Sequence, residues 1–423
     1  MSPSRGRRQF LLLAGTAALA TPYLWRADAR AAKGRVVIIG GGAGGAVLAR
    51  GLAQSGAGLD ITLIEPKSRY TTCFFSNRYI AGVQDFESLT FNYARLAAEG
   101  VRIVPESALS IDPDARQVGL AGGHVVAWDR LVVAPGIDFR WDAIEGYGPE
   151  AAEIMPHAWR AGPQTRLLRA QLEAMEDGGI FLIAPPEEPY RCPSGPYERV
   201  SMVAHYFRQA KPKSKIVILD AKSEFPLQAQ FEEGWATNYP GMIEVIPADF
   251  SGGPRAVDTA AMTVMSEDSG LKVSAANVIP PQFAGRIARD AGLADDSGWC
   301  PVDLGTFEST LIPGIHVIGD SAIASPMPKA GYAASLQAKT CAGAILHGLT
   351  GRGMSDLALG GACWSHVTPE DAIREYAEYG YVDGVLTRTL LDISPVGETG
   401  DQRAATAAAA AGWFHDITQE MFG

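Results

Sequence analysis

The chain has 423 residues, of which 47% are hydrophobic and 20% are charged, and its formal net charge is -11. These values are typical of a soluble globular protein with two or three domains. Beyond the N-terminus no run of Lys and Arg is present, which excludes nucleic acid and anionic lipid surfaces as expected partners.

The first 31 residues predict an export signal. Arg7 and Arg8 precede an apolar stretch over 11–24, and small residues over 27–31 offer a cleavage site. Paired arginines before such a stretch are typical of twin-arginine export. A membrane anchor is the alternative, but it needs about 20 apolar residues, and Pro22 interrupts this shorter stretch. We therefore expect a folded protein delivered to the periplasm.

A dinucleotide-binding unit follows. The pattern predicts a buried strand over 35–39, a helix over 46–55 and a second strand over 60–64. Gly40, Gly42 and Gly45 form G-x-G-x-x-G between the first strand and the helix, with Ala43 inside the motif. Such glycines allow a tight turn and close approach to a pyrophosphate. Glu65 ends the second strand, where a carboxylate binds a ribose hydroxyl.

A second α/β unit starts near residue 164, and the chain returns to the first domain near 278–281. The expected fold class is α/β, with two Rossmann-like dinucleotide-binding domains and a small α+β C-terminal domain. Further elements are expected over 131–134, 165–175, 179–183, 197–209, 215–219, 315–318, 333–346 and 404–411. The glycine motif does not separate FAD from NAD, but His-Val-Ile-Gly-Asp over 316–320 resembles the Gly-Asp motif of FAD-dependent two-dinucleotide-domain reductases, which implies FAD. The expected domains are an FAD-binding domain (32–160 and 280–348), a second Rossmann-like domain (161–279) and a C-terminal interface domain (349–423).

The second unit lacks a pyrophosphate site of its own. After the strand over 179–183 the chain reads Ala184-Pro185-Pro186-Glu187-Glu188-Pro189. Proline has no N–H to donate to a phosphate, and the two carboxylates would repel it. We therefore expect that NAD(P)H is not the reductant.

The five cysteines, at positions 73, 192, 300, 341 and 363, are too few for a disulfide scaffold. None forms C-x-x-C with another, so the sequence predicts no covalent haem on this chain and no metal site. Cys300 and Cys341 are expected to have packing roles.

Longer segments around three of these cysteines resemble a known family. They read Tyr-Thr-Thr-Cys-Phe-Phe-Ser-Asn over 70–77, Tyr-Arg-Cys-Pro-Ser-Gly-Pro-Tyr-Glu-Arg over 190–199, and Ala-Cys-Trp-Ser over 362–365. Together with 156–159, 298–303 and 326–332 they resemble the flavoprotein subunit of flavocytochrome c sulfide dehydrogenase. This family is related to sulfide:quinone oxidoreductases and to glutathione-reductase-like enzymes. The resemblance extends over the whole mature chain.

The resemblance implies a set of site residues. Cys73 matches the cysteine that the family joins to the 8α-methyl of FAD as a thioether; an inert buried cysteine is the alternative. Cys192 and Cys363 match the redox-active pair beside the flavin. Glu198 is the candidate proton acceptor, although a solvated helix carboxylate would look the same. The cofactor-binding set adds the family-like residues Trp159, Asp320, expected on the ribityl chain, and Lys329, for which a surface role is the alternative.

The resemblance also implies a function. It indicates a periplasmic sulfide dehydrogenase that passes electrons from sulfide, through a disulfide and covalent FAD, to a c-type cytochrome on a separate chain. Quinone is a less favoured acceptor, since the C-terminus has no strongly apolar or basic amphipathic anchor. Trp413 and Phe414 line a cytochrome-facing surface or pack in the core. The alternative functions are an accessory flavoprotein of the Sox thiosulfate-oxidation system and an NAD(P)H-dependent disulfide reductase.

Overall fold

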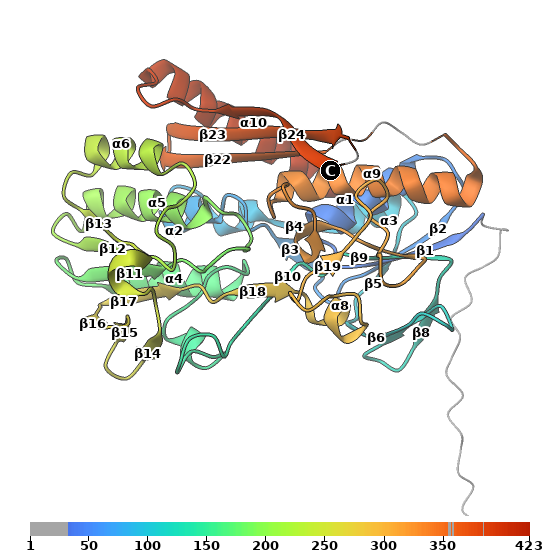
Figure 1. Cartoon of the computed structure of the whole chain (residues 1–423), viewed down its shortest axis with the longest axis horizontal. Helices are drawn as coiled ribbons and strands as arrows, with labels where there is room; N and C mark the ends of the chain where they lie inside the picture. The colour runs from blue at the N-terminus through green and yellow to red at the C-terminus, as the bar shows by residue number, and fades with distance from the viewer. Residues whose placement is uncertain (1–32, 354–356, 358, 384) are drawn as a thin grey trace, which may run out of the picture.

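The computed structural model describes residues 33–353, 357, 359–383 and 385–423. The expected export signal at 1–31 lies outside these residues. Two parallel sheets, each with helices packed on it, lie side by side, and the C-terminal segment lies along the top of both (Figure 1). None of the described helices is long and apolar enough to cross a membrane.

The first sheet has five parallel strands in the order β20-β9-β1-β2-β5. Its central strand β1 (Arg35–Ile39) is buried on both faces after its first residue, as the run of Val and Ile predicts. Helix α1 (Ala43–Gln54) packs against α9 (Gly331–Thr350) over this sheet. The other strands are β2 (Asp60–Ile64), β5 (Arg102–Val104), β9 (Arg130–Val133) and β20 (Ile315–Val317).

The second sheet has four parallel strands in the order β13-β12-β11-β17. These are β11 (Ile180–Ala184), β12 (Lys215–Leu219), β13 (Ile243–Ile246) and β17 (Ala275–Val278). The helices of this unit are α4 (Pro163–Ala174), α5 (Gly195–Ala210) and α6 (Gln228–Asn238). All three helices pack on the face of the sheet that carries Phe181 and Ile183. The opposite face, which carries Leu182, packs against residues of the 144–155 and 257–273 segments, so both faces of the parallel sheet are buried.

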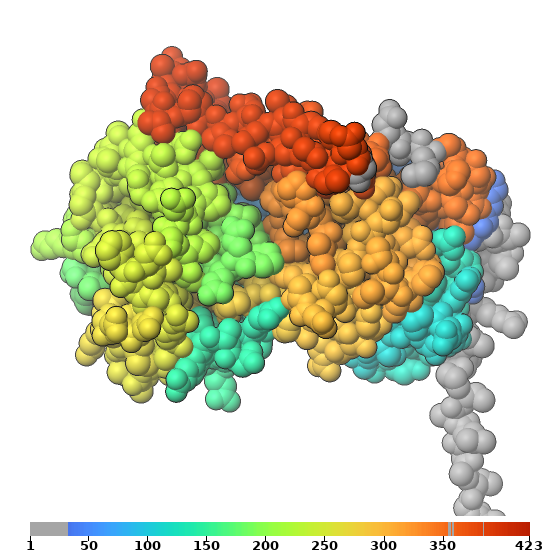
Figure 2. All heavy atoms as spheres, in the orientation of Figure 1, coloured from blue at the N-terminus to red at the C-terminus, as the bar shows by residue number. Residues whose placement is uncertain are grey.

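The C-terminal unit consists of an antiparallel sheet, β22 (Gly360–Thr368), β23 (Asp371–Val382) and β24 (Val385–Ile393), followed by α10 (Gly400–Phe422). Strand β22 contacts α5 and α6 of the second unit and α9 of the first. The space-filling view shows this segment covering the upper edge of both bodies (Figure 2). The C-terminal unit thus brings β22 to the junction of the two α/β units.

Short elements complete the chain. The strands are β3 (Arg69–Thr71), β4 (Thr90–Asn92), β6 (Ala108–Asp112), β7 (Gln117–Leu120), β8 (Val125–Ala127), β10 (Ile137–Phe139), β14 (Ala256–Asp258), β15 (Thr263–Met265), β16 (Gly270–Lys272), β18 (Gln282–Ala284), β19 (Cys300–Pro301) and β21 (Ala322–Ile323). The helices are α2 (Ser76–Ile80), α3 (Ala94–Ala98), α7 (Ala248–Ser251), α8 (Arg286–Asp290) and the 3-10 turns Phe86–Leu89, Ala151–Glu153 and Gly319–Ser321.

The expected α/β class is confirmed, and helix ends account for most local differences. The helix expected over 46–55 begins at Ala43, and the one expected over 333–346 extends over Gly331–Thr350. In α1, Gly44 and Gly45 of the glycine motif belong to the first helical turn, because a phosphate-binding loop leads directly into the helix that follows it. The antiparallel strands of the short sheets were not predicted, since they are mostly three or four residues long.

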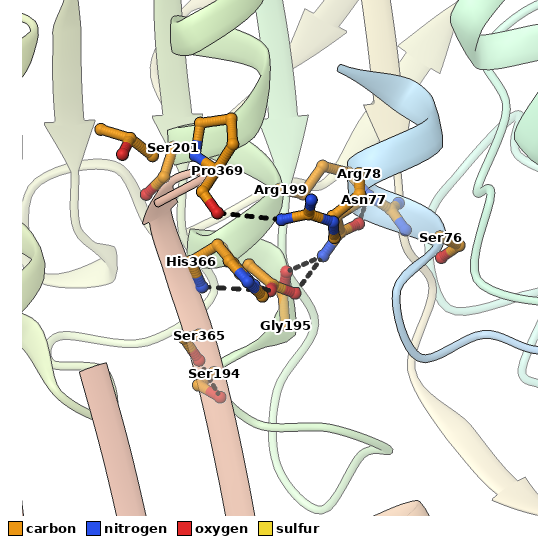
Figure 3. Close-up of polar contacts among 12 residues, drawn as sticks. Ser76, Asn77, Arg78, Ser194, Gly195, Arg199, Ser201, Ser365, His366 and Pro369 are labelled. Atoms are coloured by element: carbon orange, nitrogen blue, oxygen red, sulfur yellow. Dashed lines mark hydrogen bonds and ion pairs between the residues drawn. The ribbon is translucent and has the colours of Figure 1, made fainter. Parts of the chain in front are cut away.

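A buried arginine joins the two α/β units. Arg199, on α5, is 2% exposed and donates to Oδ1 of Asn77 on α2 at 2.9 Å and to Oδ1 of Asn277 on β17 at 2.7 Å. It also donates to the carbonyls of His157 (3.3 Å) and Ala158 (2.8 Å). Figure 3 shows Asn77 and Arg199 meeting beside α5. These bonds hold α2, the 156–158 segment and the second sheet together.

Arg199→Gln should lower the free energy of unfolding by about 3 kcal/mol, because several buried acceptors lose a charged donor. Urea unfolding of the FAD-loaded protein measures the effect. Arg286→Gln is the matched control: the Arg286 side chain is 79% exposed, and we expect a change within about 0.5 kcal/mol. Equal effects of the two substitutions would contradict the role given to Arg199.

Candidate functional site

The glycine motif forms a cradle at the end of β1 in which side chains do not fit. Gly40 has φ +99°, and a Cβ there would lie 2.3 Å from the carbonyl oxygen of Ala134. A Cβ on Gly45 would lie 1.9 Å from the carbonyl oxygen of Gly40. Because only glycine fits at these positions, the backbone can approach a phosphate closely.

Glu65 lies beside this cradle and shapes it. Its two carboxylate oxygens accept hydrogen bonds from the backbone N–H of Gly41 and of Lys67, each at 3.0 Å. Each oxygen retains a lone pair for a ribose hydroxyl. The geometry therefore suits the role predicted for Glu65.

A long cavity, here called the nucleotide cavity, runs from the cradle to Cys73. Asp320 lies on its wall, with Oδ2 3.7 Å from a guanidinium nitrogen of Arg191. Gly42 and Ala43 also contribute to the wall, at the start of α1. Gly40, Gly41 and Glu65 line the end of this cavity at the cradle. The cavity therefore fits an extended FAD molecule, with the glycine cradle at the pyrophosphate, Glu65 at the ribose and Asp320 farther along.

A second cavity, here called the thiol cavity, joins the nucleotide cavity at Cys73. Its wall includes Cys192, Cys363 and Trp159. The indole Nε1 atoms of Trp159 and Trp364 are buried there without a hydrogen-bond partner among the described residues. Such donors normally bind an acceptor, and a flavin ring carries carbonyl and ring-nitrogen acceptors. The two joined cavities therefore fit a complete FAD, with its ring end near the thiols.

Cys73 occupies the junction of both cavities. Burial raises the pKa of its thiol, Arg191 opposes this shift, and the charge of Asp320 adds to it. The Cys73 carbonyl accepts from the Ser76 N–H at 3.2 Å and from its hydroxyl at 2.5 Å, which fixes the turn that leads into α2. The predicted flavin-linked cysteine thus lies where the ring end of the cofactor would lie.

Cys192 and Cys363 come together although they are far apart in the sequence. Cys192 precedes α5 and Cys363 lies on β22, and both are free thiols in this structure. A hydrogen bond with Cys363, then burial, raise the pKa of Cys192 well above its usual range. Cys192 has φ +57°, and its N–H donates to the carbonyl of Lys329 at 2.7 Å. The sulfur positions therefore depend on the packing of β22 against α5.

Glu198 is anchored rather than free. One carboxylate oxygen accepts from the N–H and Nδ1 of His366 at 3.1 and 3.0 Å, and the other from Asn77 at 2.7 Å. Burial pushes the pKa of Glu198 upward, but the hydrogen bonds and charge of His366, with Asn77, outweigh it and leave the pKa below its usual range. A carboxylate with a low pKa is a weak base at neutral pH. The proton-acceptor role stays a prediction, and this geometry favours positioning of the thiol pair.

Lys329 contacts the thiol pair through its backbone carbonyl, which accepts from the N–H of Cys192. Its ammonium donates to the carbonyls of Asp320 (2.8 Å) and Ala322 (2.9 Å) and lies 3.7 Å from the ring centroid of Trp299. Burial lowers its pKa to about 8. It braces the turn that carries Asp320, and it does not line the nucleotide or the thiol cavity among the described residues. A direct contact with FAD stays a prediction.

The other two cysteines pack in the interior. Cys300 is fully buried next to Trp299, and burial raises its pKa to about 12. Cys341 is fully buried on α9, and burial raises its pKa further. Both agree with the expected packing roles.

In the second α/β unit, side chains of the protein itself surround the acid at the end of β12, where a nucleotide ribose would bind. Tyr197 stacks on Phe225 with ring centroids 3.8 Å apart, and its hydroxyl donates to Asp220 at the end of β12. Lys222 donates to the same carboxylate at 2.7 Å and to the Pro186 carbonyl at 2.9 Å. The acid that would bind a ribose is therefore already engaged.

The structure adds Gly195, Asn77 and His366 to the predicted site residues and brings Trp413 to the thiol cavity. Gly195 matters because a Cβ there would lie 2.8 Å from Sγ of Cys192 and 2.9 Å from the Trp159 ring. Asn77 on α2 and His366 on β22 orient Glu198 on α5. Figure 3 shows Asn77 and His366 on either side of this helix start. Trp413 stacks on Trp364 at 5.4 Å and lines the thiol cavity. Long-range packing sets all four contacts, and no local motif reports it.

Three family models match successive parts of the chain. Residues 34–169 match the pyridine nucleotide-disulphide oxidoreductase model. Residues 165–280 match the central part of the sulfide dehydrogenase (flavocytochrome c) flavoprotein chain, and residues 357–422 match the flavocytochrome c sulphide dehydrogenase flavin-binding model.

Individual relatives point the same way. The sulfide dehydrogenase (flavocytochrome c) flavoprotein chain of Chlorobaculum thiosulfatiphilum is 49% identical over 43 residues, which are 10% of this chain and 90% of that sequence. The mitochondrial sulfide:quinone oxidoreductase of Mus musculus is 22% identical over 67% of this chain, and the match spans 65% of the mouse protein. The structure of the sulfide:quinone oxidoreductase from Aquifex aeolicus superposes with a TM-score of 0.73 at 19% identity, covering 91% of this chain and 92% of that one.

Gly195→Ala should displace the sulfur of Cys192, because the added methyl group would overlap Sγ and the Trp159 ring. We expect disulfide formation between Cys192 and Cys363 under a mild oxidant to slow about tenfold, the effect of about 1.4 kcal/mol on the barrier. Mass spectrometry of alkylated peptides measures this rate. Gly412→Ala on α10, where a Cβ meets nothing within 4 Å, should leave it unchanged. An unchanged rate in Gly195→Ala would refute the steric argument.

Proposed function

The chain belongs to the flavocytochrome c sulfide dehydrogenase flavoprotein family, and we propose that it oxidises hydrogen sulfide with a Cys192–Cys363 disulfide and bound FAD. One observation carries this proposal: two thiols from separate units share a cavity that opens at Cys73 into the nucleotide cavity. A thiol pair next to a flavin site is the arrangement that couples disulfide exchange to two-electron transfer.

The reaction at the cysteines is thiol–disulfide exchange. HS⁻ forms a bond to one sulfur of the oxidised pair as the S–S bond breaks, and the bonding pair of electrons leaves on the other sulfur. The products are a cysteine persulfide and a thiolate. FAD bound in the joined cavities would supply the two-electron acceptor that also releases electrons singly. Arg191 lies on the walls of both cavities, and its charge favours the thiolate.

We propose a thioether between Cys73 and FAD. The position of Cys73 at the junction of the two cavities supports this bond, as does the family match. A covalent link would retain the cofactor after export, since no free FAD is supplied outside the cytoplasm.

The proposed electron acceptor is a c-type cytochrome on a separate chain, in the periplasm. The name of the Chlorobaculum relative, a flavocytochrome c flavoprotein chain, supports this partner. The hairpin of β23 and β24 supports it too, because it exposes large apolar side chains, which often mark protein interfaces. These are Tyr381, Val382, Val385, Leu390 and Leu391. The contacts of Tyr197 and Lys222 with Asp220, at the end of β12 in the second α/β unit, argue against NAD(P)H as reductant.

Cys73→Ala should abolish covalent attachment, while the glycine cradle still binds FAD. Denatured wild-type protein should carry the added mass of one FAD and remain yellow after acid precipitation, and the variant should lose both. Cys300→Ala is the control and should retain the added mass. Wild-type protein without that mass would refute the tether without refuting sulfide oxidation.

Cys192→Ser should abolish reduction of the flavin by sulfide under anaerobic conditions, because no disulfide remains to be attacked. The loss should exceed about 100-fold, the scale expected when a reacting group is removed. Absorbance of the oxidised flavin reports the rate. Cys341→Ser, in the interior of α9, should reduce at the wild-type rate if it folds. Bleaching of wild-type flavin by NADH as fast as by sulfide would instead favour an NAD(P)H-dependent reductase.

A further inference from the structure

Cys363 also borders a second opening, here called the outer pocket. Its wall and that of the thiol cavity share Ser194, Ala362 and Cys363. Cys192 is not among the described residues that line the outer pocket. Cys363 is therefore the sulfur of the pair that a small molecule in this pocket can reach.

Glu375 lies directly across the sheet from Cys363. The antiparallel register of β22 and β23 pairs these two residues. Residues in such positions point to the same face of the sheet, with Cβ atoms about 4.5–5.5 Å apart. Both residues line the outer pocket, so a carboxyl group accompanies the accessible sulfur.

The surroundings of Glu375 keep it available. Burial and the charge of Glu188 raise the pKa of Glu375, and Arg388 on β24 opposes the shift; no hydrogen bond contributes. Lys329 lines the same pocket, but its ammonium is committed to two backbone carbonyls. The titratable or charged groups that line the pocket or act on Glu375 are Glu188, Tyr190, Lys329, Cys363, Tyr379 and Arg388.

We propose that neutral hydrogen sulfide enters through the outer pocket and that Glu375 accepts its proton beside Cys363, while Glu188 and Glu375 exclude anions. This inference rests on the proposed function and names the form of its substrate. It gives Glu375 the role of proton acceptor and leaves Glu198 as a positioning residue.

The step balances with groups already named. H₂S gives one proton to the Glu375 carboxylate and becomes HS⁻. The HS⁻ sulfur bonds to Sγ of Cys363 as the Cys192–Cys363 bond breaks, and the electron pair leaves on Sγ of Cys192. The oxidant is the disulfide, and the products are a persulfide on Cys363, a thiolate on Cys192 and a protonated Glu375.

A carboxyl group with a raised pKa suits this task better than one with a lowered pKa, because a base works best when its pKa is near the working pH. Glu198 has its pKa lowered and both oxygens occupied. Glu375 differs on both points. Carboxylates at the mouth of a pocket also repel HS⁻ and other anions.

Anion exclusion can be tested without sulfide. The FAD-loaded protein is reduced with dithiothreitol and treated with iodoacetamide or iodoacetate, which differ in charge more than in size. Peptide mass spectrometry then gives the two alkylation rates at Cys363. Glu375→Gln and Glu188→Gln should each lower the iodoacetamide-to-iodoacetate ratio about fivefold, the scale of one charge–charge interaction at 4 Å in water. Glu378→Gln, an exposed position on the same strand, should leave the ratio unchanged.

Proton transfer is tested by the pH dependence of flavin reduction at constant H₂S concentration. Wild-type reduction should slow as the pH falls and Glu375 becomes protonated. Glu375→Gln should lack this acid limb and react about 100-fold more slowly at its plateau, since a positioned base contributes at least that factor. Glu188→Gln should keep the plateau and move the acid limb to lower pH, because Glu188 raises the pKa of Glu375.

The outcomes separate the two proposals. Wild-type flavin that sulfide does not reduce would overturn the proposed function, whatever the alkylation ratios. Normal reduction in the wild type together with an unchanged rate and acid limb in Glu375→Gln would overturn the role of Glu375 alone. Alkylation ratios that do not change in either variant would overturn anion exclusion.

Discussion

The buried guanidinium of Arg199 is the interaction on which the site depends. A charge without water is stable only when its donors are satisfied, and here the acceptors come from α2, the 156–158 segment and β17. Burial lowers the Arg199 pKa to about 9, which leaves it charged at neutral pH. The two α/β units cannot move apart without exposing or orphaning this charge.

Glu198 extends this constraint to the third unit. It lies in the first turn of α5, the helix that Cys192 precedes, and it accepts hydrogen bonds from His366 on β22 and from Asn77 on α2. The hydroxyls of Ser194 and Ser365 form a second link between α5 and β22 at 3.0 Å. Because Cys192 precedes α5 and Cys363 lies on β22, the contacts that hold the units together also set the distance between the sulfurs.

Two separate cavities, the thiol cavity and the outer pocket, border the Cys192 and Cys363 pair. The thiol cavity faces Cys73 and the nucleotide cavity, where an acceptor of electrons belongs. The outer pocket faces Cys363 and the carboxyl of Glu375, where a small acid belongs. Lys329 lines the outer pocket, Asp320 lines the nucleotide cavity, and the Lys329 carbonyl accepts from the N–H of Cys192, which has a left-handed conformation. The two cavities thus border the thiol pair separately, which is the arrangement that the proposed function requires.

The sequence by itself determined the parts of this protein that local chemistry controls. The segment over 35–65 is readable as strand, glycine turn, helix and acid because each part depends on neighbours in the chain. The prolines after β11 predict the lack of a phosphate site for the same reason, since proline has no N–H to donate. The proximity of Cys192 and Cys363 was expected only through the family resemblance. The positions of Gly195 and Glu375 emerged only from the tertiary structure, since strand register and the packing of separate units set them. The hydrogen bonding of both Glu198 carboxylate oxygens is likewise a tertiary property, because its partners, Asn77 and His366, come from two segments that no sequence pattern connects to α5.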